Sequence, residues 1–508
     1  MPRTLYVSTA IPYVNAPPHL GFALEMVLAD ALARHARAAG ERVHFVSGTD
    51  ENSLSNVRAA EAAGVPVREL VDANAARYRG LDRLLGASFD DFVRTSVDPR
   101  HLAAVHAIWN ACARAGDLER RTYRGLYCVG CEQFYELDEL DEGLCPEHRR
   151  APEAVEEDNW FFRLSRYERP IREALTSGRL RIEPRERARE VEQFLAGGPR
   201  DISVSRSRAR ARGWGIPVPG DPDQVVWVWL DALANYLATL GYPSDELQCR
   251  RFWTEADRRV HVVGKGIARF HAIVWPALLL AAGLSLPTTI WVHGYLTVGG
   301  QKIGKSRGNA VDPAVIVERY GIDALRYFLL RHVGPKHDAD VDDARISAAY
   351  RSELADGLGN LLSRTVALLR SAAAARVPPP PASGLDPLGE ELAARAAGLE
   401  REVRDAVERF APDDALKAIW TIVAAANKHL ADTAPWALAK QIECVARVQA
   451  ILHHTAFALG AIGRSLVPFL PATASAIVEA LAAPEQPVPI LFPKKDLGRG
   501  PSDQSESL

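Results

Sequence analysis

Leu5-Tyr6-Val7-Ser8-Thr9-Ala10 reads as a buried strand, and it opens the pattern that decides the fold. A long helix is predicted next, from about residue 19 to residue 39, and it ends at Gly40 as helices often do. Residues 42–46 form a second strand, which runs into a polar loop at 47–53. A strand, a helix and a strand in this order predict a βαβ unit and therefore a parallel sheet. Ligands bind beyond the carboxyl ends of such strands, so the loops at 12–22 and 47–53 are expected to line a site.

A second stretch, Gly299-Gly300-Gln301-Lys302-Ile303-Gly304-Lys305-Ser306, follows a β-rich segment. Its glycines leave room for a polyphosphate, and its two lysines supply ammonium groups to hold one. The eight residues match the P-loop pattern G-x-x-x-x-G-K-[ST], but a P-loop needs a helix that begins at its Lys-Ser. Here the next good helix start is Asp312-Pro313. A true P-loop, a glycine-rich hairpin turn and a phosphate-clamping loop all stay open at this point.

Length and composition set the class of protein. The chain has 508 residues, which is too long for one core and predicts two to four domains. Its 47% apolar and 25% charged content is ordinary for a globular protein, and a net charge of −3 argues against a generally basic nucleic-acid coat. The longest apolar run, near 274–282, is too short to span a bilayer, and no signal peptide is expected at the start. We expect a cytoplasmic protein without membrane contact.

Three of the six cysteines cluster with a histidine. Cys128 and Cys131 form one C-x-x-C pair, and after thirteen intervening residues Cys145 and His148 form a C-x-x-H pair. Two such knuckles predict a tetrahedral zinc site, favoured over free thiols, in which the protein fills all four positions. A filled site has no place for a reacting water, so the zinc is expected to be structural.

An imidazole and a glycine begin the predicted helix at His19-Leu20-Gly21-Phe22, and a helix start suits phosphate binding. This early motif and the late Lys302-Ile303-Gly304-Lys305-Ser306 resemble the H-x-G-H and K-M-S-K-S signatures of class I aminoacyl-tRNA synthetases. Further motifs narrow the resemblance to the methionyl-tRNA synthetases, in order from about residue 4 to residue 490. They stand at residues 10–15, 48–51, 228–232, 235–236, 264–265 and 269–271.

The resemblance implies an α/β fold: a class I Rossmann-like catalytic domain with an inserted zinc-knuckle connective domain, followed by an all-α anticodon-binding helix bundle. The implied segments are a first catalytic half at 1–116, the insertion at 117–225, a second catalytic half at 226–297, a lysine-loop region at 298–350, the bundle at 351–493 and a disordered tail at 494–508. From the residues themselves, 54–116 reads as helical, 225–231 as a return to the buried sheet, 260–265 as the next strand and 267–281 as a helix. Bundle helices are predicted near 386–410, 412–431, 438–464 and 470–482.

The implied reaction joins L-methionine and ATP to methionyl-adenylate with release of pyrophosphate, and then passes the methionyl group to the 3′ end of tRNA(Met). Such a site positions the reactants and stabilises developing charge, so it needs no protein nucleophile. Mg²⁺ would accompany the ATP. By resemblance, the catalytic residues are His19, Gly21, Lys302 and Lys305, and the ATP-binding set adds Gly264, Lys265 and Ser306.

The resemblance also implies two binding surfaces. Around the methionine side chain it places Ile11, Tyr13, Trp229, Ala232, Leu233, Tyr236, Ile267, Phe270 and His271, with Asp50 at the ammonium group. Aromatic and aliphatic groups suit a thioether, although each of them alone could be ordinary core. For the anticodon the implied residues are Asn360, Arg364 and Trp436. Asn360 could otherwise be a buried helix contact, and Trp436 could be a core residue. A monomer is expected.

Some positions depart from the family pattern. Phe22 replaces the second histidine of the early signature, and a lost donor there could cost roughly 3 kcal/mol in the transition state. Gly304 replaces a serine, Gly266 a common aspartate, and Asn52-Ser53 a common His-Gly. These changes keep open a paralog that gives its aminoacyl group to a small molecule, and a non-catalytic RNA-binding or regulatory protein. Asp231 could also be read as a Walker B carboxylate, although it precedes the supposed P-loop.

Overall fold

Among the residues that the structure describes, six parallel strands form the central sheet, in the order β3-β2-β1-β12-β13-β7. Their bounds are β1 Thr4–Thr9, β2 Arg42–Thr49, β3 Asp91–Arg94, β7 Arg181–Glu183, β12 Arg258–Gly264 and β13 Thr289–His293. The computed structural model describes residues 2–131, 133–135, 137–147, 149–303, 309–487 and 490–494. Helix α1 (Leu20–Ala38) contacts β1, β2 and β12, so the predicted βαβ unit at the start of the chain is confirmed.

Contacts divide the chain into two units. The first unit comprises Met1–Tyr295 and Ile303–Pro313, and the second comprises Leu296–Lys302 and Ala314–Leu508. In the first unit the remaining helices are α2 Leu54–Ala63, α3 Val67–Arg79, α4 Leu81–Leu85, α5 Pro99–Arg114, α6 Glu168–Thr176, α7 Arg185–Ala196, α8 Val228–Ala238, α9 Glu246–Cys249 and α10 Trp275–Ala281.

Antiparallel strands dominate the segment that was expected to be inserted. One sheet has the order β5-β4-β6-β8, and a smaller one has the order β10-β11-β9. Their bounds are β4 Leu118–Cys128, β5 Gln133–Tyr135, β6 Glu153–Phe162, β8 Ile202–Ser203, β9 Ser205–Ser207, β10 Pro217–Val218 and β11 Asp221–Val226. The same segment also contains β7, which pairs with β13, so it contributes a strand to the parallel sheet as well.

Two readings of secondary structure were wrong. Residues 225–231 do not return to the parallel sheet: β11 pairs with β9 and β10, and α8 begins at Val228. Helix α8 is buried along nearly its whole length, and a helix that is apolar on every side has the same continuous hydrophobic run as a buried strand. The helical reading of 54–116 missed β3, which has only four residues and lies at the edge of the sheet.

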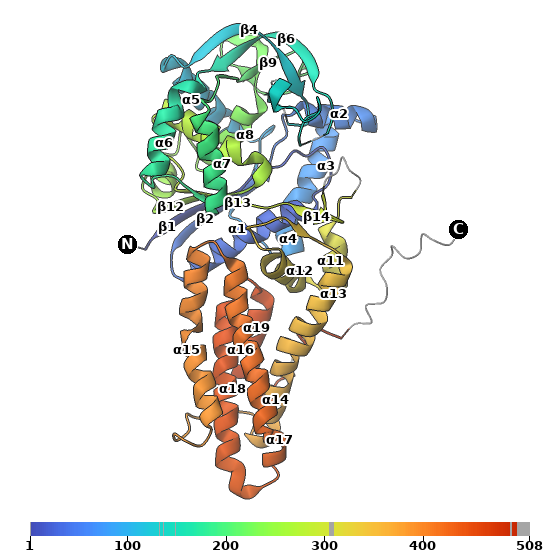
Figure 1. The fold of residues 1–508 in the computed structure, drawn as a ribbon, viewed down its shortest axis with the longest axis vertical. Coiled ribbons are helices and arrows are strands. Elements are labelled where there is room, and N and C mark those ends of the chain that lie inside the picture. The colour runs from blue at the N-terminus through green and yellow to red at the C-terminus, as the bar shows by residue number, and fades with distance from the viewer. Residues whose placement is uncertain are drawn as a thin grey trace, which may run out of the picture. The chain divides into compact units, whose positions relative to one another are not determined.

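Long helices form the second unit. Figure 1 shows α15, α16 and α18 side by side, as their contacts require. The helices after the hairpin described below are α11 Pro313–Tyr320, α12 Ile322–Phe328, α13 Asp343–Ala349, α14 Asn360–Ala372, α15 Pro387–Glu408, α16 Pro412–Thr433, α17 Pro435–Leu438, α18 Val445–Leu466 and α19 Pro471–Ala482. The fold class expected from the resemblance is confirmed. No helix among the described residues combines the length and hydropathy needed to cross a membrane.

The glycines at the start of the lysine stretch form a hairpin. Gly299 and Gly300 have φ values of 58° and 76° and join β14 (Leu296–Val298) to β15 (Gln301–Lys302) in antiparallel register. Positive φ at both central residues is what a tight two-residue hairpin turn requires. The Gly300 N–H donates to Oδ1 of Asp340, in the adjacent strand β16 (Ala339–Asp340), over 3.0 Å. This part of the stretch is therefore a strand-turn-strand, which differs from the strand-loop-helix of a P-loop.

Candidate active site

His19 caps the first helix of the sheet. Its backbone is extended, and Nδ1 accepts a hydrogen bond from the Gly21 N–H over 3.0 Å. A Cβ added at Gly21 would lie 2.8 Å from Cε1 of His19, so only glycine lets the imidazole fold over the helix start. Because Nδ1 is the acceptor, a neutral His19 carries its proton on Nε2 and can donate from there. The two residues expected in the early signature are therefore brought together.

Glu25 is a buried carboxylate that the sequence reasoning missed. One oxygen accepts the Ala10 N–H over 2.7 Å. The other accepts the Gly264 N–H, and it also lies 3.1 Å from Nε2 of His293. Ala10 follows β1, and Gly264 and His293 end β12 and β13, so Glu25 fixes the carboxyl ends of three parallel strands. Nothing in local spacing marks it, because its partners lie up to 268 residues away.

Aromatic rings gather where the methionine pocket was expected. Trp229 and Phe270 stack with ring centroids 3.7 Å apart and an interplanar angle of 8°. Leu233 and Tyr236 belong to the adjoining hydrophobic core, and Tyr13, Trp229, Ile267 and Phe270 pack against that core. Ala232 is buried on the same helix, α8. Ile11 lies near the Gly48 backbone of β2.

His271 is a neutral group in this cluster. Its Nδ1 lies 2.9 Å from the Ile267 carbonyl, which can only accept, so Nδ1 carries the proton. Nε2 is therefore the acceptor for the Tyr236 hydroxyl over 2.7 Å. Burial lowers the pKa of His271 to about 4, although the hydrogen bond to Ile267 opposes the shift. The cluster thus presents aromatic and aliphatic surface with a hydroxyl and an uncharged imidazole.

Asp50 lies directly beyond β2 and is buried. Its N–H donates to the Pro12 carbonyl over 2.9 Å, and its own carbonyl accepts from the Asn56 side chain. Residue 50 also forms an isolated bridge with Tyr13. Asp50 therefore joins the two loops that were expected to line the site to each other.

Lys265 lies beyond β12, and its ammonium is 4.4 Å from the centre of the Tyr295 ring. The hydroxyl of Tyr295 donates to Oε2 of Glu147 over 3.1 Å. A Cβ added at Gly266 would lie 2.2 Å from that hydroxyl. A side chain at position 266 would therefore require the Tyr295 hydroxyl to move.

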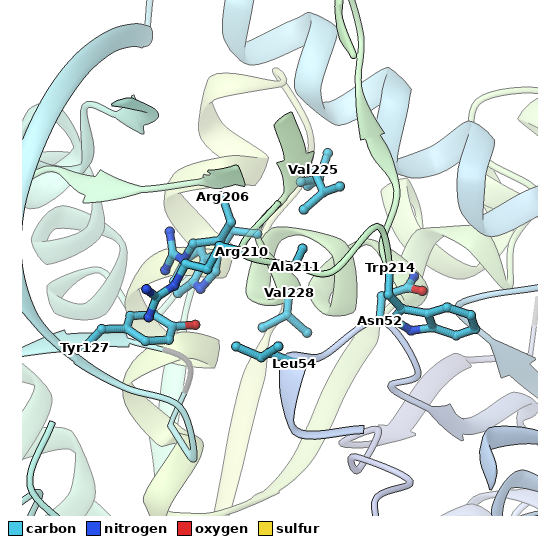
Figure 2. A pocket seen from close by; sticks show the side chains of 11 residues that line it. Asn52, Leu54, Tyr127, Arg206, Arg210, Ala211, Trp214, Val225 and Val228 are labelled. Atoms are coloured by element: carbon cyan, nitrogen blue, oxygen red, sulfur yellow. The ribbon is translucent and has the colours of Figure 1, made fainter. Parts of the chain in front are cut away.

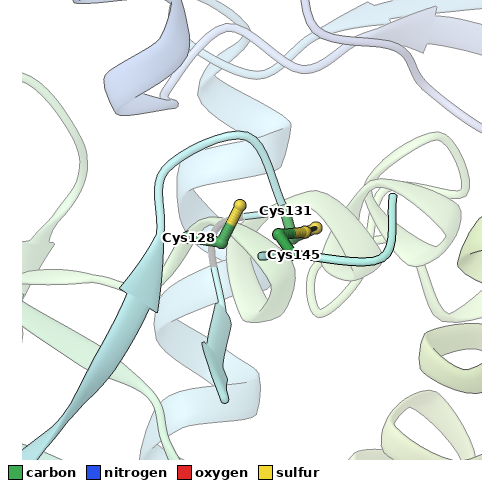
Figure 3. Close-up of side chains that lie close together, drawn as sticks. All are labelled: Cys128, Cys131 and Cys145. Carbon is green, nitrogen blue, oxygen red and sulfur yellow. Dashed lines mark hydrogen bonds between the residues drawn. The ribbon is translucent and has the colours of Figure 1, made fainter. Parts of the chain in front are cut away.

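The three clustered cysteines lie close enough together to hold a metal ion, with all their sulfur atoms within 4.8 Å of one another (Figure 3). Zn–S bonds of about 2.3 Å in a tetrahedron separate sulfurs by about 3.8 Å, so the donor set fits zinc. The hydrogen bond with Cys128, together with burial, raises the pKa of the Cys131 thiol. The Trp229 indole N–H donates to the Cys131 carbonyl over 3.1 Å, which ties this knuckle to α8.

The second unit holds the residues expected at the anticodon. Asn360 begins α14, and Arg364 lies one turn later on the same helix. The Arg364 guanidinium carbon is 4.9 Å from the centre of the Trp436 ring, and Trp436 is 44% exposed. Lys302, in β15, also belongs to this unit. His148, Gly304, Lys305 and Ser306 lie outside the described residues.

Comparison with known proteins extends over nearly the whole chain. A family model described as class I tRNA synthetases (M) matches residues 5–152 and 148–366. The chain is 38% identical over 483 residues to a methionine–tRNA ligase of Brucella suis, covering 94% of this chain and 92% of the relative. The chain belongs to the class I methionyl-tRNA synthetase family. The resemblance predicted from the signatures is thus confirmed.

Other proteins similar to this chain belong to the same family. A methionine–tRNA ligase of Thermotoga maritima is 36% identical over 487 residues, covering 95% of this chain and 76% of the relative. A Mycobacterium tuberculosis methionyl-tRNA synthetase solved in complex with methionyl-adenylate is 38% identical, with a TM-score of 0.90. That match covers 96% of this chain and 95% of the solved one, so both units have counterparts.

A small pocket is lined by residues that include Asn52 and Val228, which are close in sequence to Asp50 and Trp229 (Figure 2). Figure 2 shows Tyr127, Arg206 and Arg210 on one side and Asn52 and Trp214 on the other. The buried Arg206 donates to the Ser203 hydroxyl and the Ser205 carbonyl, and its guanidinium lies 4.9 Å from the Tyr127 ring. Of the residues expected to bind methionine or ATP, none that the structure describes lines this pocket.

Phe22, which departs from the early signature, belongs to the core. It is 7% exposed and meets Tyr78 edge-to-face, with ring centroids 5.4 Å apart. The ring therefore contributes packing between α1 and α3, where an imidazole would need a polar partner.

Proposed function

We propose that the protein is a methionine–tRNA ligase. It converts L-methionine and ATP to methionyl-adenylate and pyrophosphate, and it transfers the methionyl group to the 3′ end of tRNA(Met). The observation that carries this proposal is the match, over 96% of the chain, to a synthetase solved with methionyl-adenylate. The neutral aromatic cluster at the expected amino-acid site is consistent with a thioether substrate.

The first step is an in-line attack of the methionine carboxylate on the α-phosphate of ATP. Here the protein holds the reactants and stabilises the charge that develops on the phosphates. Nε2 of His19 is the donor at the helix start, and Lys302 and Lys305 are assigned to the β- and γ-phosphates. Gly264, Lys265 and Ser306 complete the nucleotide set, and Mg²⁺ is assigned as the counter-ion of ATP.

Selection of the amino acid rests on a pocket without charge. Trp229, Tyr236 and Phe270 surround a thioether with polarizable surface, and burial keeps His271 neutral at physiological pH. A charged side chain would lose its water there without gaining an opposite charge. Asp50 is assigned to the substrate ammonium group, which every amino acid shares.

Transfer to tRNA is preferred over transfer to a small molecule. The Arg364–Trp436 pair and Asn360 offer stacking and hydrogen-bonding groups of the kind that read unpaired bases. A small-molecule transferase would have no use for them. The cytoplasmic location and monomeric state expected from the sequence remain part of this proposal.

The metal at the knuckle is proposed to be a structural zinc ion held by Cys128, Cys131, Cys145 and His148. Zinc would tie together the end of β4 and the residues near Cys145, and through Cys131 it would support the position of Trp229.

The test is ATP–pyrophosphate exchange with each of the twenty amino acids, followed by charging of tRNA(Met). We expect exchange with methionine alone and charging of tRNA(Met). Exchange with another amino acid would overturn the substrate, and exchange without charging would favour the small-molecule alternative.

Trp436→Ala separates the two steps. Stacking of one base is worth about 1–3 kcal/mol, so charging should fall about tenfold or more while exchange is unchanged. Phe457→Ala is the matched control, because this aromatic side chain of the same unit is 40% exposed, close to the 44% of Trp436. Equal charging by the two variants would refute the anticodon assignment.

A further inference from the structure

Asp231 is a buried carboxylate that joins two other elements to α8. Its Oδ2 accepts a hydrogen bond from Nδ2 of Asn52 over 2.8 Å, and its Oδ1 forms a short hydrogen bond with Nε2 of His101. Asp231 and His101 are both fully buried. The three side chains come from the loop after β2, from α5 and from α8. A carboxylate with no exposure is tolerated because two donors satisfy it.

The loop that carries Asn52 is also held from its other side. The Glu51 carboxylate accepts from the Arg94 guanidinium over 2.7 Å and from the Thr49 hydroxyl over 2.8 Å. The backbone N–H of Glu51 donates to the Thr95 hydroxyl, and the backbone carbonyl of Glu51 accepts from the Trp214 indole N–H. Residues 51 and 52 are thus fixed to different parts of the first unit, with Asp50 directly before them.

We infer that Asp231 is a positioning residue for amino-acid activation. Through its hydrogen bond with Asn52, Asp231 sets the distance between the loop that carries Asp50 and the side-chain pocket on α8. The inference rests on the proposed function, in which Asp50 meets the substrate ammonium group and α8 carries the pocket residues Trp229 and Tyr236. Neither assignment gives Asp231 a substrate contact of its own.

The position of Asp231 explains why a carboxylate is needed there. It lies on α8 between Trp229 and Ala232, so a contact at this point holds the same turn of helix that presents the pocket. The ammonium and the thioether are opposite ends of one substrate, and both ends must be seated for the carboxylate to face ATP. A shift between the two anchors would keep one end of methionine away from its contacts, which weakens the binding of methionine and leaves the contacts of ATP in place. Asn52 and His101 contact different oxygens of the Asp231 carboxylate, so this side chain cannot rotate freely.

Swapping the side chains of residues 52 and 231 tests this inference. In Asn52→Asp two carboxylates face each other, and in Asp231→Asn one hydrogen bond must change its direction. In the double variant the amide and the carboxylate trade places, so the contact between residues 52 and 231 can form again. His101 can then donate to the amide oxygen at position 231.

The readout is pyrophosphate exchange, with the KM for the amino acid, the KM for ATP and kcat measured separately. We expect Asn52→Asp to raise the KM for methionine about tenfold or more while the KM for ATP changes less than about twofold, and we expect the double variant to recover most of the loss. The inference is overturned if both KM values and kcat change together, if nothing changes, or if the effects of the two substitutions simply add.

The same experiment keeps the two proposals apart. Failure of the unmodified protein to use methionine would refute the proposed function. The swapped variants can then be tested with whichever amino acid the protein activates. Asn52 is partly exposed, so its variants are not expected to prevent folding, and circular dichroism and hydrogen exchange of α8 verify this.

Discussion

Replacing Gly389 with alanine should destabilise the helical unit, although helix propensity predicts the opposite. Gly389 is in the first turn of α15, and alanine is favoured over glycine in a helix by up to about 1 kcal/mol. In the structure, however, a Cβ at this position would lie 1.8 Å from Oδ2 of Asp386 and 2.3 Å from Nδ1 of His454. One of these groups must move.

Asp386 is the centre of a buried cluster. It caps α15 by accepting the Gly389 N–H over 3.1 Å, and its Oδ2 lies 2.9 Å from both Nε2 of His429 and Nδ1 of His454. Burial alone would raise the pKa of Asp386, but the hydrogen bonds from the two histidines hold it below its ordinary value. The cluster therefore joins α15, α16 and α18 through a carboxylate that stays ionised.

The expected cost follows from the contacts that the alanine breaks. Loss of the helix cap costs about 1 kcal/mol, and each hydrogen bond to the carboxylate is worth about 1.5–3 kcal/mol. After subtracting the gain in propensity, we expect Gly389→Ala to lower the free energy of unfolding of this unit by about 3 kcal/mol. Gly398→Ala in the same helix is the matched control, because its Cβ would find only a glutamate oxygen, 3.9 Å away. The control should be stabilised by up to about 1 kcal/mol.

Hydrogen exchange of α15, α16 and α18 in the full chain reports the opening of this unit separately from the parallel sheet. Exchange should accelerate in Gly389→Ala and slow in Gly398→Ala, while α1 stays unchanged in both. If the two variants exchange alike, the Asp386 cluster does not stabilise the unit and the reasoning is refuted.

Three further predictions concern the first unit. Metal analysis of purified protein should find one zinc ion per chain, and a folded, active protein without zinc would contradict the knuckle assignment. Because the pKa of His271 is about 4 when folded and about 6.5 when unfolded, its contribution to stability is complete above pH 6.5 and should fall by about 3 kcal/mol as the pH drops to 4. Urea unfolding across this range should show the loss, and His271→Gln should flatten it; an equal slope in the variant would assign the effect elsewhere. Gly266→Asp should lower pyrophosphate exchange about tenfold or more, because its Cβ overlaps the Tyr295 hydroxyl, and adding Tyr295→Phe should restore part of the rate. No recovery in the double variant would mean that crowding by Tyr295 is not the cause.

Sequence alone determined the features whose signal is local. The first strand, helix and strand follow from hydrophobic periodicity and a helix stop, and the structure places them at β1, α1 and β2. Four helices predicted near 386–482 correspond to α15, α16, α18 and α19 within a few residues, except that α18 begins about seven residues later than predicted. The cysteine spacing singled out three sulfurs that do come together. The two signatures and the motifs between them also gave the family, because a series of short motifs in a fixed order is rarely shared by chance.

Only the tertiary structure decided what depends on distant neighbours. Residues 228–231 were mistaken for part of a buried strand because a helix buried on all sides shows no polar face, and β3 and β7 became strands because partners in the sheet satisfy their backbones. Gly266 departed from the family pattern in the sequence, whereas in the structure it makes room for Tyr295. Glu25 and Asp386 carried no mark in the sequence, and Asp231 was marked only as part of the 228–232 motif and as a possible Walker B carboxylate, not by the contacts that it makes. Each is a buried carboxylate whose donors lie far along the chain, and a charge can be buried only where the finished fold brings those donors to it.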